Sequence, residues 1–307
     1  MVHTAVGGGL DDSQTAVYVN CASRKTEKAR CARGALTLDT RNGPFAAWDF
    51  GGDGPDVLLV HGTGHNLTAQ FRVAAFDMRG HGQTPVESTN AERYWRDLAE
   101  VSSALGVSRP LLVGHSTGGY AVTAFAGSGG ECSAVVALDG LVLDGRKTPE
   151  EEKDWYLPTE QLWDLFRYGW VASPDEVDAY VQEVCLAAAN DWLNAGIDVS
   201  VVAAFTRRSF LKDGASFVRR PTMEEIAMVS VPDSRAEIYP SVDLYSRIAV
   251  PLGLVLAEKG LYGHREKDVM AIVGNHPDRH FIKLESGHNV HMQKPEEIAR
   301  FITRNFL

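Results

Sequence analysis

The pentapeptide at residues 114–118, Gly-His-Ser-Thr-Gly, constrains the fold of this chain more than any other segment. It follows the apolar run Leu111–Val113, which is typical of a buried strand, and precedes Ala121–Ala126, which continues as an apolar helix. A turn this tight between strand and helix needs small residues on both sides of its tip, which accounts for the two glycines. The serine at the tip is lifted to a helix N-terminus, where backbone N–H groups are free. The pattern predicts a nucleophile elbow with Ser116 as the reactive residue.

Three other segments fit the same architecture in order and spacing. The strand Val57–Val60 opens into His-Gly-Thr-Gly at residues 61–64, and the strand Arg72–Asp77 opens into Met-Arg-Gly-His-Gly at residues 78–82. Ser-Gly-His-Asn at residues 286–289 precedes a predicted helix over Pro295–Phe306. With these motifs the chain resembles the α/β-hydrolase superfamily over about residues 35–307. The resemblance implies a mostly parallel central sheet with helices on both faces, the α/β-hydrolase fold, and a helical cap insertion.

Composition shifts along the chain divide it into three regions. Residues 1–34 are polar and Gly-rich, and we expect a poorly ordered N-terminal extension there. Residues 35–140 and 246–307 alternate strand and helix patterns, beginning with a hairpin over residues 35–50, and form the predicted core. Residues 141–245 form the predicted helical cap. It is rich in aromatic residues that are expected to contribute to an apolar substrate chamber: Trp155, Tyr156, Trp163, Phe166, Tyr168, Trp170 and Trp192.

The connection after the 61–64 loop departs from the family pattern. Relatives place a full helix there, which needs about ten or more residues to pack on the sheet. Here only Leu67-Thr68-Ala69-Gln70 separates His65-Asn66 from the next strand. Either another element covers that face, or the sequence carries a deletion that exposes apolar sheet surface.

A serine hydroxyl needs a base, and the base needs an orienting acid. His288 follows the last predicted strand, so its loop is expected at the same sheet edge as Ser116, whereas His291 is a weaker candidate. Asp139 ends the strand after the elbow helix and is the favoured acid; Glu258, which ends the following strand, is the alternative.

The resemblance implies an oxyanion hole made of the backbone N–H groups of Thr63 and Thr117. Glycines beside Thr63 allow that loop to turn. The remaining motif residues are expected to have structural roles, with His115 packing inside the elbow; they are His61, His65, His81, His115 and Asp77.

The bulk composition narrows the partners. The net charge of −10 with no basic stripe argues against nucleic acid and anionic membranes, so the expected partner is a small-molecule substrate. No apolar run reaches the length of a membrane span and the start does not resemble a secretory signal, so a cytoplasmic protein is expected. The four cysteines fit neither a zinc site nor a redox pair, so free thiols, no metal and no cofactor are expected. The oligomeric state stays open.

The leading hypothesis is a cofactor-independent serine hydrolase that cleaves a carboxylic ester or lactone of a small, largely apolar substrate through an acyl-enzyme. A serine at the elbow disfavours the epoxide and haloalkane branches, which use an aspartate. Two alternatives remain: a carbon–carbon bond hydrolase acting on diketones, and a non-catalytic ligand-binding member of the same fold.

Overall fold

The computed structural model describes residues 17–18, 34–60, 71–148, 150–151, 163–164, 166–230 and 232–307. Most of the predicted N-terminal extension (residues 1–34) lies outside the described residues, apart from β1 (Val17–Tyr18) and the first residue of β2. The predicted oxyanion loop with Thr63, and the short connection that follows it, also lie outside them.

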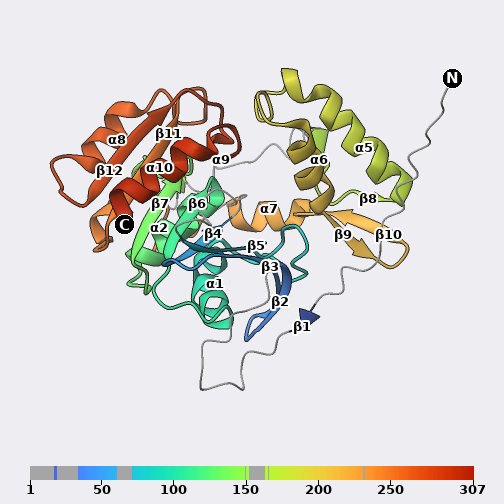
Figure 1. The fold of residues 1–307 in the computed structure, drawn as a ribbon, viewed down its shortest axis with the longest axis horizontal. Helices are drawn as coiled ribbons and strands as arrows, with labels where there is room; N and C mark the ends of the chain where they lie inside the picture. The colour runs from blue at the N-terminus through green and yellow to red at the C-terminus, as the bar shows by residue number, and fades with distance from the viewer. Residues whose placement is uncertain are drawn as a thin grey trace.

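A nine-stranded sheet runs through the molecule in the order β1-β2-β3-β5-β4-β6-β7-β11-β12 (Figure 1). Strands β5, β4, β6, β7, β11 and β12 are parallel to one another, whereas the hairpin of β2 and β3 is antiparallel, as is the pairing of β3 with β5. This sheet confirms the predicted fold class. The strands are β2 (Gly34–Thr40), β3 (Gly43–Gly51), β4 (Asp56–Val60), β5 (Arg72–Phe76), β6 (Leu111–His115), β7 (Ala134–Leu138), β11 (Leu252–Ala257) and β12 (Arg279–Leu284).

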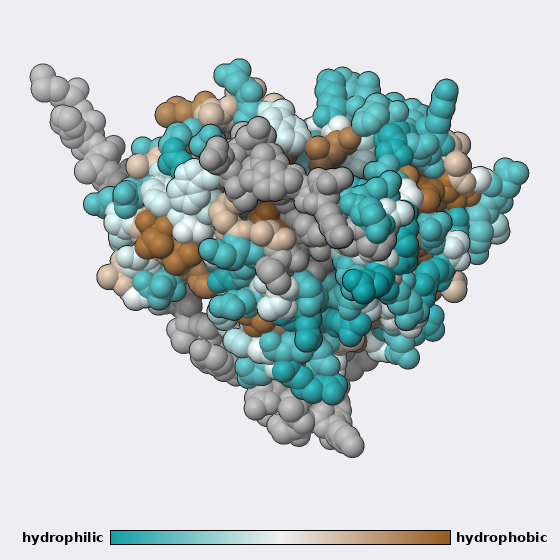
Figure 2. All heavy atoms as spheres, turned by 180° about the vertical axis from the view of Figure 1, so that it is seen from behind, coloured by the Kyte–Doolittle hydropathy of each residue, from teal (hydrophilic) through white to brown (hydrophobic). Residues whose placement is uncertain are grey.

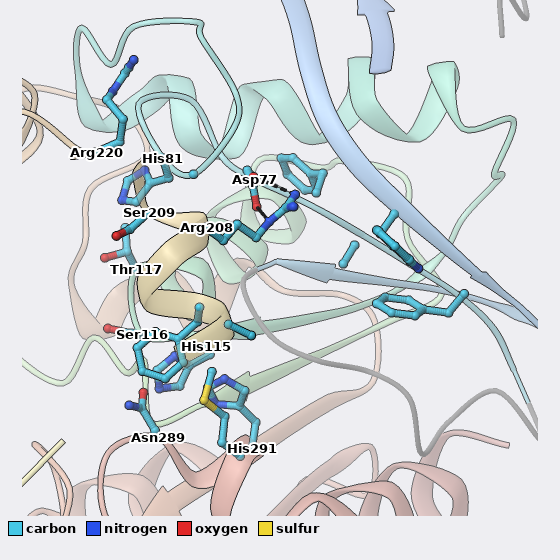
Figure 3. Close-up of a pocket in the computed structure, with 18 residues that line it drawn as sticks. Asp77, His81, His115, Ser116, Thr117, Arg208, Ser209, Arg220, Asn289 and His291 are labelled. Atoms are coloured by element: carbon cyan, nitrogen blue, oxygen red, sulfur yellow. Dashed lines mark hydrogen bonds and ion pairs between the residues drawn. The ribbon is translucent and has the colours of Figure 1, made fainter. Parts of the chain in front are cut away.

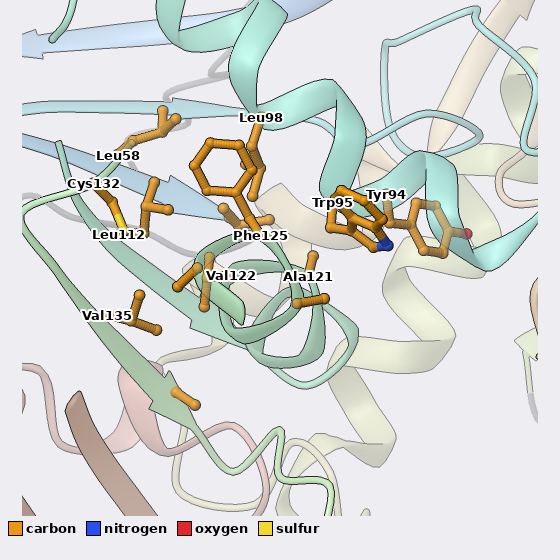
Figure 4. Close-up of a cluster of buried hydrophobic side chains, with 14 of the residues drawn as sticks. Leu58, Tyr94, Trp95, Leu98, Leu112, Ala121, Val122, Phe125, Cys132 and Val135 are labelled. Carbon is orange, nitrogen blue, oxygen red and sulfur yellow. The ribbon is translucent and has the colours of Figure 1, made fainter. Parts of the chain in front are cut away.

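Helices cover both faces of the sheet because its buried strands are apolar on both sides. On β6, Leu112 joins the core under α1 (Ala91–Ala104), α2 (Thr117–Gly127) and α8 (Glu266–Val273), as Figure 4 shows for α1 and α2. Its neighbours Leu111 and Val113 point to the other face, where they join the core under α10 (Pro295–Phe306). The predicted last helix has the observed bounds. Two cores therefore hold the sheet from opposite sides and fix the strand ends that carry the site.

Most of the segment between β7 and β11, called the cap below, lies to one side of the sheet (Figure 1), whereas its last part, with η4, packs on α2 in the core. It contains α5 (Pro174–Ala187), the 3-10 turn η3 (Ala188–Asn190), α6 (Val199–Arg208), α7 (Met223–Ser230) and the 3-10 helix η4 (Val242–Arg247). The predicted cap boundaries, residues 141 and 245, fall inside this segment. It also contains a small antiparallel sheet that the sequence analysis did not foresee, in the order β8-β10-β9. Its strands are β8 (Val171–Ala172), β9 (Phe210–Asp213) and β10 (Ser216–Arg219).

The cap has its own small core, which accounts for some of the aromatic residues of this region. Tyr180 of α5, Phe210 of β9 and Trp170 contact one another edge to face, with ring centroids 5.6–6.0 Å apart. Helix α5 begins with a capping box, in which Ser173 and Glu176 bond reciprocally, and with Pro174 in its first turn. Part of the aromatic content of the cap is therefore structural.

The surface view in Figure 2 shows a face on which hydrophilic residues predominate and hydrophobic ones form small separate groups. Among the described residues, no helix combines the length and apolarity required to cross a bilayer.

Candidate active site

Ser116 occupies a tight elbow between β6 and α2, as the sequence predicts. Its φ of 52° lies in the left-handed region, which a residue other than glycine adopts only under strong constraint. The constraint is close backbone approach: a Cβ on Gly114 would lie 2.1 Å from the carbonyl oxygen of Gly118. A Cβ on Gly140, after β7, would lie 2.1 Å from the carbonyl oxygen of Ser116 itself. Glycine at these positions lets the backbone close around the serine.

The structure brings Ser116, His288 and Asp139 together in one hydrogen-bonded chain. His288 Nε2 lies 3.1 Å from Ser116 Oγ, and His288 Nδ1 lies 2.7 Å from Asp139 Oδ2. Asp139 is fully buried, and His288 is almost so. When the Nδ1–H group donates a hydrogen bond to the carboxylate, Nε2 carries no proton and can accept the serine proton. This arrangement activates a serine nucleophile.

Asp139 is held in place by the backbone around the end of β11. Its Oδ1 accepts a hydrogen bond from the N–H of Ala257, and its Oδ2 accepts one from the N–H of Leu261, each at 3.2 Å. A Cβ on Gly260 would lie 2.2 Å from Asp139 Oδ2, so this loop leaves space for the carboxylate. Glu258, the alternative acid of the sequence analysis, is exposed at the end of β11. The carboxylate that bonds to His288 is that of Asp139.

Two further histidines surround His288, a feature that the sequence analysis missed. His115 packs inside the elbow, as expected, but its Nε2–H also donates to the backbone carbonyl of His288 at 2.9 Å. Its ring lies 4.7 Å from that of His288 and 4.2 Å from that of His291 (centroid distances). Burial and the neighbouring His288 lower the pKa of His291 to about 3, so His291 is neutral near pH 7. The signal in the sequence was the pairing of a histidine before the serine with one three residues after His288.

Only one of the two predicted oxyanion donors falls within the described residues. Thr117 is the first residue of α2, so its N–H has no partner within the helix. Thr117 also lines the cavity beside Ser116. Thr63, the second predicted donor, lies outside the described residues.

A cavity of about 620 Å³ opens onto Ser116 between the sheet and the cap (Figure 3). Strands β3 and β5, the turn after β5, the elbow, α6 and the His288 loop all contribute to its lining. The lining residues are Trp48, Phe50, Ala75, Phe76, Asp77, His81, Gly82, His115, Ser116, Thr117, Ala204, Phe205, Arg208, Ser209, Arg220, Asn289, His291 and Met292.

The turn after β5 fastens the cap to the core at the cavity wall. Asp77 accepts two hydrogen bonds from the guanidinium group of Arg208 on α6, at 3.1 and 2.8 Å, and one from the backbone N–H of Gln83 at 2.8 Å. The Gln83 side chain in turn donates to the carbonyls of Arg208 and Phe210. Asp77 therefore supports its turn, as expected, and also holds the cap. In the same turn, burial lowers the pKa of His81, whose Nδ1 bonds to the carbonyl of Arg79.

A second fastening ties the His288 loop to the cap. The side chain of Asn289 donates to the carbonyl of Leu193 at 3.0 Å, and that of Gln293 donates to the carbonyl of Ala195 at 2.7 Å. The cap is thus bonded to the core on both sides of the cavity.

Within the part of the chain that the structure describes, no group of three or more His, Cys, Asp or Glu side chains has the arrangement of a metal site. Cys132 and Cys185 are free thiols, while Cys21 and Cys31 lie outside the described residues.

Comparison with curated proteins gives matches over short stretches. The chain is 34% identical over 99 residues to protein phosphatase methylesterase 1 of Bos taurus, which covers 26% of this chain and 26% of that protein. It is also 34% identical over 103 residues to an uncharacterised protein of Mycobacterium bovis, covering 30% of each chain. The chain therefore spans less than a third of the length of these curated relatives.

Comparison with solved structures covers nearly the whole chain. The fold is similar to that of E-2-(acetamidomethylene)succinate hydrolase, with a TM-score of 0.65 and 19% identity, covering 88% of this chain and 98% of that one. It is also similar to a thermophilic esterase from Thermogutta terrifontis, with a TM-score of 0.58 and 20% identity, covering 88% and 97%. Residues 57–301, most of the chain, match the profile of the alpha/beta hydrolase family. On this match, and on a sheet and elbow of the same design, the protein belongs to the alpha/beta hydrolase family.

Proposed function

We propose that the protein is a cofactor-independent serine hydrolase that cleaves a carboxylic ester or lactone of a small, largely apolar substrate. The observation that carries this proposal is the hydrogen-bonded chain from Ser116 through His288 to Asp139 at the edge of a cavity. Family membership and the likeness to a methylesterase over part of the chain support ester chemistry.

The proposed reaction has two halves. In the first, Ser116 Oγ attacks the substrate carbonyl carbon while its proton passes to His288 Nε2, and Asp139 remains ionised and stabilises the imidazolium. The resulting oxyanion accepts a hydrogen bond from the N–H of Thr117, a type of contact that stabilises the transition state by about 3 kcal/mol. His288 then protonates the leaving alkoxide, and the alcohol departs to leave an acyl-enzyme. In the second half, water attacks the acyl carbon while His288 takes its proton; the bond from the acyl carbon to Ser116 Oγ then breaks, His288 returns the proton to Oγ, and the carboxylic acid leaves.

The first experiment measures hydrolysis of para-nitrophenyl esters by the purified protein, together with labelling by a fluorophosphonate. The wild-type protein is expected to turn over the esters and to be labelled, and Ser116→Ala is expected to do neither. Exposed Ser246→Ala is the matched control and should behave as wild type. A wild-type protein that is neither active nor labelled contradicts the proposal and leaves the ligand-binding alternative. Labelling without ester turnover, together with cleavage of a diketone, supports the carbon–carbon alternative.

A further inference from the structure

The cavity extends from Ser116 onto one face of strands β3 and β5. Trp48 and Phe50 of β3 and Ala75 of β5 line it. All three are half-buried, whereas the residues that alternate with them on β3, Phe45 and Ala47, are buried in the core on the other face of the sheet. We call the part of the cavity lined by Trp48, Phe50 and Ala75 the strand lobe.

The strand lobe is suited to an apolar group of the substrate rather than to a charged one. Trp48 and Phe50 lie side by side with ring centroids 6.1 Å apart. The cap adds Ala204 and Phe205 of α6 to the lining of the same cavity. Apolar surface facing a cavity stabilises whatever apolar group displaces its water.

Both arginines among the described lining residues are already paired with carboxylates. Arg208 is bound through two nitrogens to Asp77, and Arg220 is bound through two nitrogens to Glu225, at 3.1 and 2.6 Å. An anionic substrate group would compete with these carboxylates. His291 is neutral near pH 7. The described part of the lining therefore favours an uncharged substrate.

We infer that the substrate is an uncharged ester with an extended apolar arm, an alkyl chain of several carbons or an aromatic ring, that binds in the strand lobe. This inference rests on the proposed function and adds the size and polarity of the substrate to it. A cavity of about 620 Å³ is within the usual range for a drug-sized ligand, and an acetyl ester would leave most of it empty. The arm belongs either to the acyl group or to the alcohol, and the test distinguishes the two.

The first series in the test consists of para-nitrophenyl esters from acetate to decanoate. The second series consists of acetate esters of alcohols from ethanol to decanol. In the series whose arm enters the lobe, kcat/KM is expected to rise about fourfold for each methylene that becomes buried. para-Nitrophenyl esters of the succinate type, whose acyl group ends in a carboxylate, serve as charged comparisons. They should be poorer substrates than the octanoate and benzoate esters. Flat profiles in both series, with labelling by fluorophosphonate intact, would overturn the inference while leaving the proposed function standing.

Filling the lobe tests its position. Ala75→Val and Ala75→Phe add increasing bulk at its wall, and valine is well suited to a strand, so at least the smaller variant is expected to fold. The longest accepted chain should shorten with each step, with at least a tenfold loss of kcat/KM on the best long ester for Ala75→Phe and less than a threefold change on the acetyl ester, as expected for steric exclusion. Exposed Ala271→Phe on α8 adds the same bulk elsewhere and should leave the profile unchanged. Equal losses on short and long esters in both Ala75 variants would contradict the inference. A wild-type protein that is not labelled by the fluorophosphonate would instead contradict the proposed function.

Discussion

Asp139 combines a positive φ of 41°, complete burial and three hydrogen bonds to its carboxylate. An aspartate tolerates this backbone conformation better than most residues. The N–H groups of Ala257 and Leu261 and the imidazole of His288 all donate to the carboxylate, so a neutral amide at this position would face a donor with its own N–H₂ group. The residue is therefore specified by its chemistry as well as by its volume.

Asp139→Asn is expected to reduce kcat for ester hydrolysis by about 10³–10⁴, because the amide no longer holds His288 in the tautomer that accepts the serine proton. Glu258→Gln, at the exposed alternative position, should stay within about twofold of wild type, as is usual for surface substitutions. Steady-state kinetics on one ester at saturating concentration measure both. Equal losses in the two variants would contradict the assignment of Asp139.

His115, the residue before the nucleophile, bonds to the backbone of His288 and so acts on the distance between Ser116 and His288. His115→Phe keeps the ring volume and removes the hydrogen bond, and we expect kcat to fall about tenfold to a hundredfold with KM nearly constant, as when a catalytic group is slightly misplaced. His115→Gln places an amide N–H near the former Nε2 and should recover most of the loss. A KM effect without a kcat effect, or no recovery with glutamine, would show that His115 only fills space.

At the scale of elements, the elbow depends on how closely its segments approach. β6, α2 and the turn after β7 meet around Ser116, and their backbones come within the distance of a single methyl group. Packing this tight makes the position of Ser116 insensitive to surrounding side chains and sensitive to any added carbon.

Gly114→Ala is expected to lower the free energy of unfolding by about 1–3 kcal/mol and to reduce fluorophosphonate labelling, since its new methyl would overlap the Gly118 carbonyl. Gly145→Ala is the matched control, because a Cβ there meets no atom within 4 Å. Urea unfolding and labelling rates give the two readouts. A Gly114→Ala protein as stable and as reactive as wild type would show that the elbow can relax.

At the scale of the whole molecule, the cap and the core enclose a site in which two histidines have lowered pKa values. His291 and His81 both have lowered pKa values, caused chiefly by burial. These lowered pKa values depend on cap, elbow and His288 loop remaining assembled, since exposure to water in the unfolded chain restores an ordinary pKa.

Stability is therefore expected to fall in acid. Between the ordinary histidine pKa of 6.5 and the value of about 3 for His291, the unfolded chain binds more protons than the folded one, so the free energy of unfolding decreases as the pH drops. His291→Leu should flatten this decrease by up to about 1.4 kcal/mol per pH unit, measured by urea unfolding at several pH values between about 7 and 4. Exposed His276→Leu is the control. Identical slopes in wild type and His291→Leu would contradict the prediction.

The sequence alone determined the elbow and the strands of the main sheet from β2 onward, but not β1, which lies in the segment expected to be poorly ordered. Strands such as Arg279–Leu284 and helices such as Pro295–Phe306 have the predicted bounds, because apolar periodicity and glycine spacing are local properties of the chain. Family motifs also placed Ser116 and His288 at one sheet edge. The sequence did not reveal the β8-β10-β9 sheet, whose strands of two to four residues are too short to show a period.

Only the tertiary structure decided which carboxylate meets His288 and what surrounds it. Asp139 and Glu258 end neighbouring parallel strands, and sequence spacing cannot tell which side chain turns inward. The contact of His115 with His288 joins residues 173 positions apart in the chain. The described residues that line the cavity come from six separate segments, which include strands, turns and a cap helix. Such long-range contacts depend on strand order and helix packing, which no local pattern encodes.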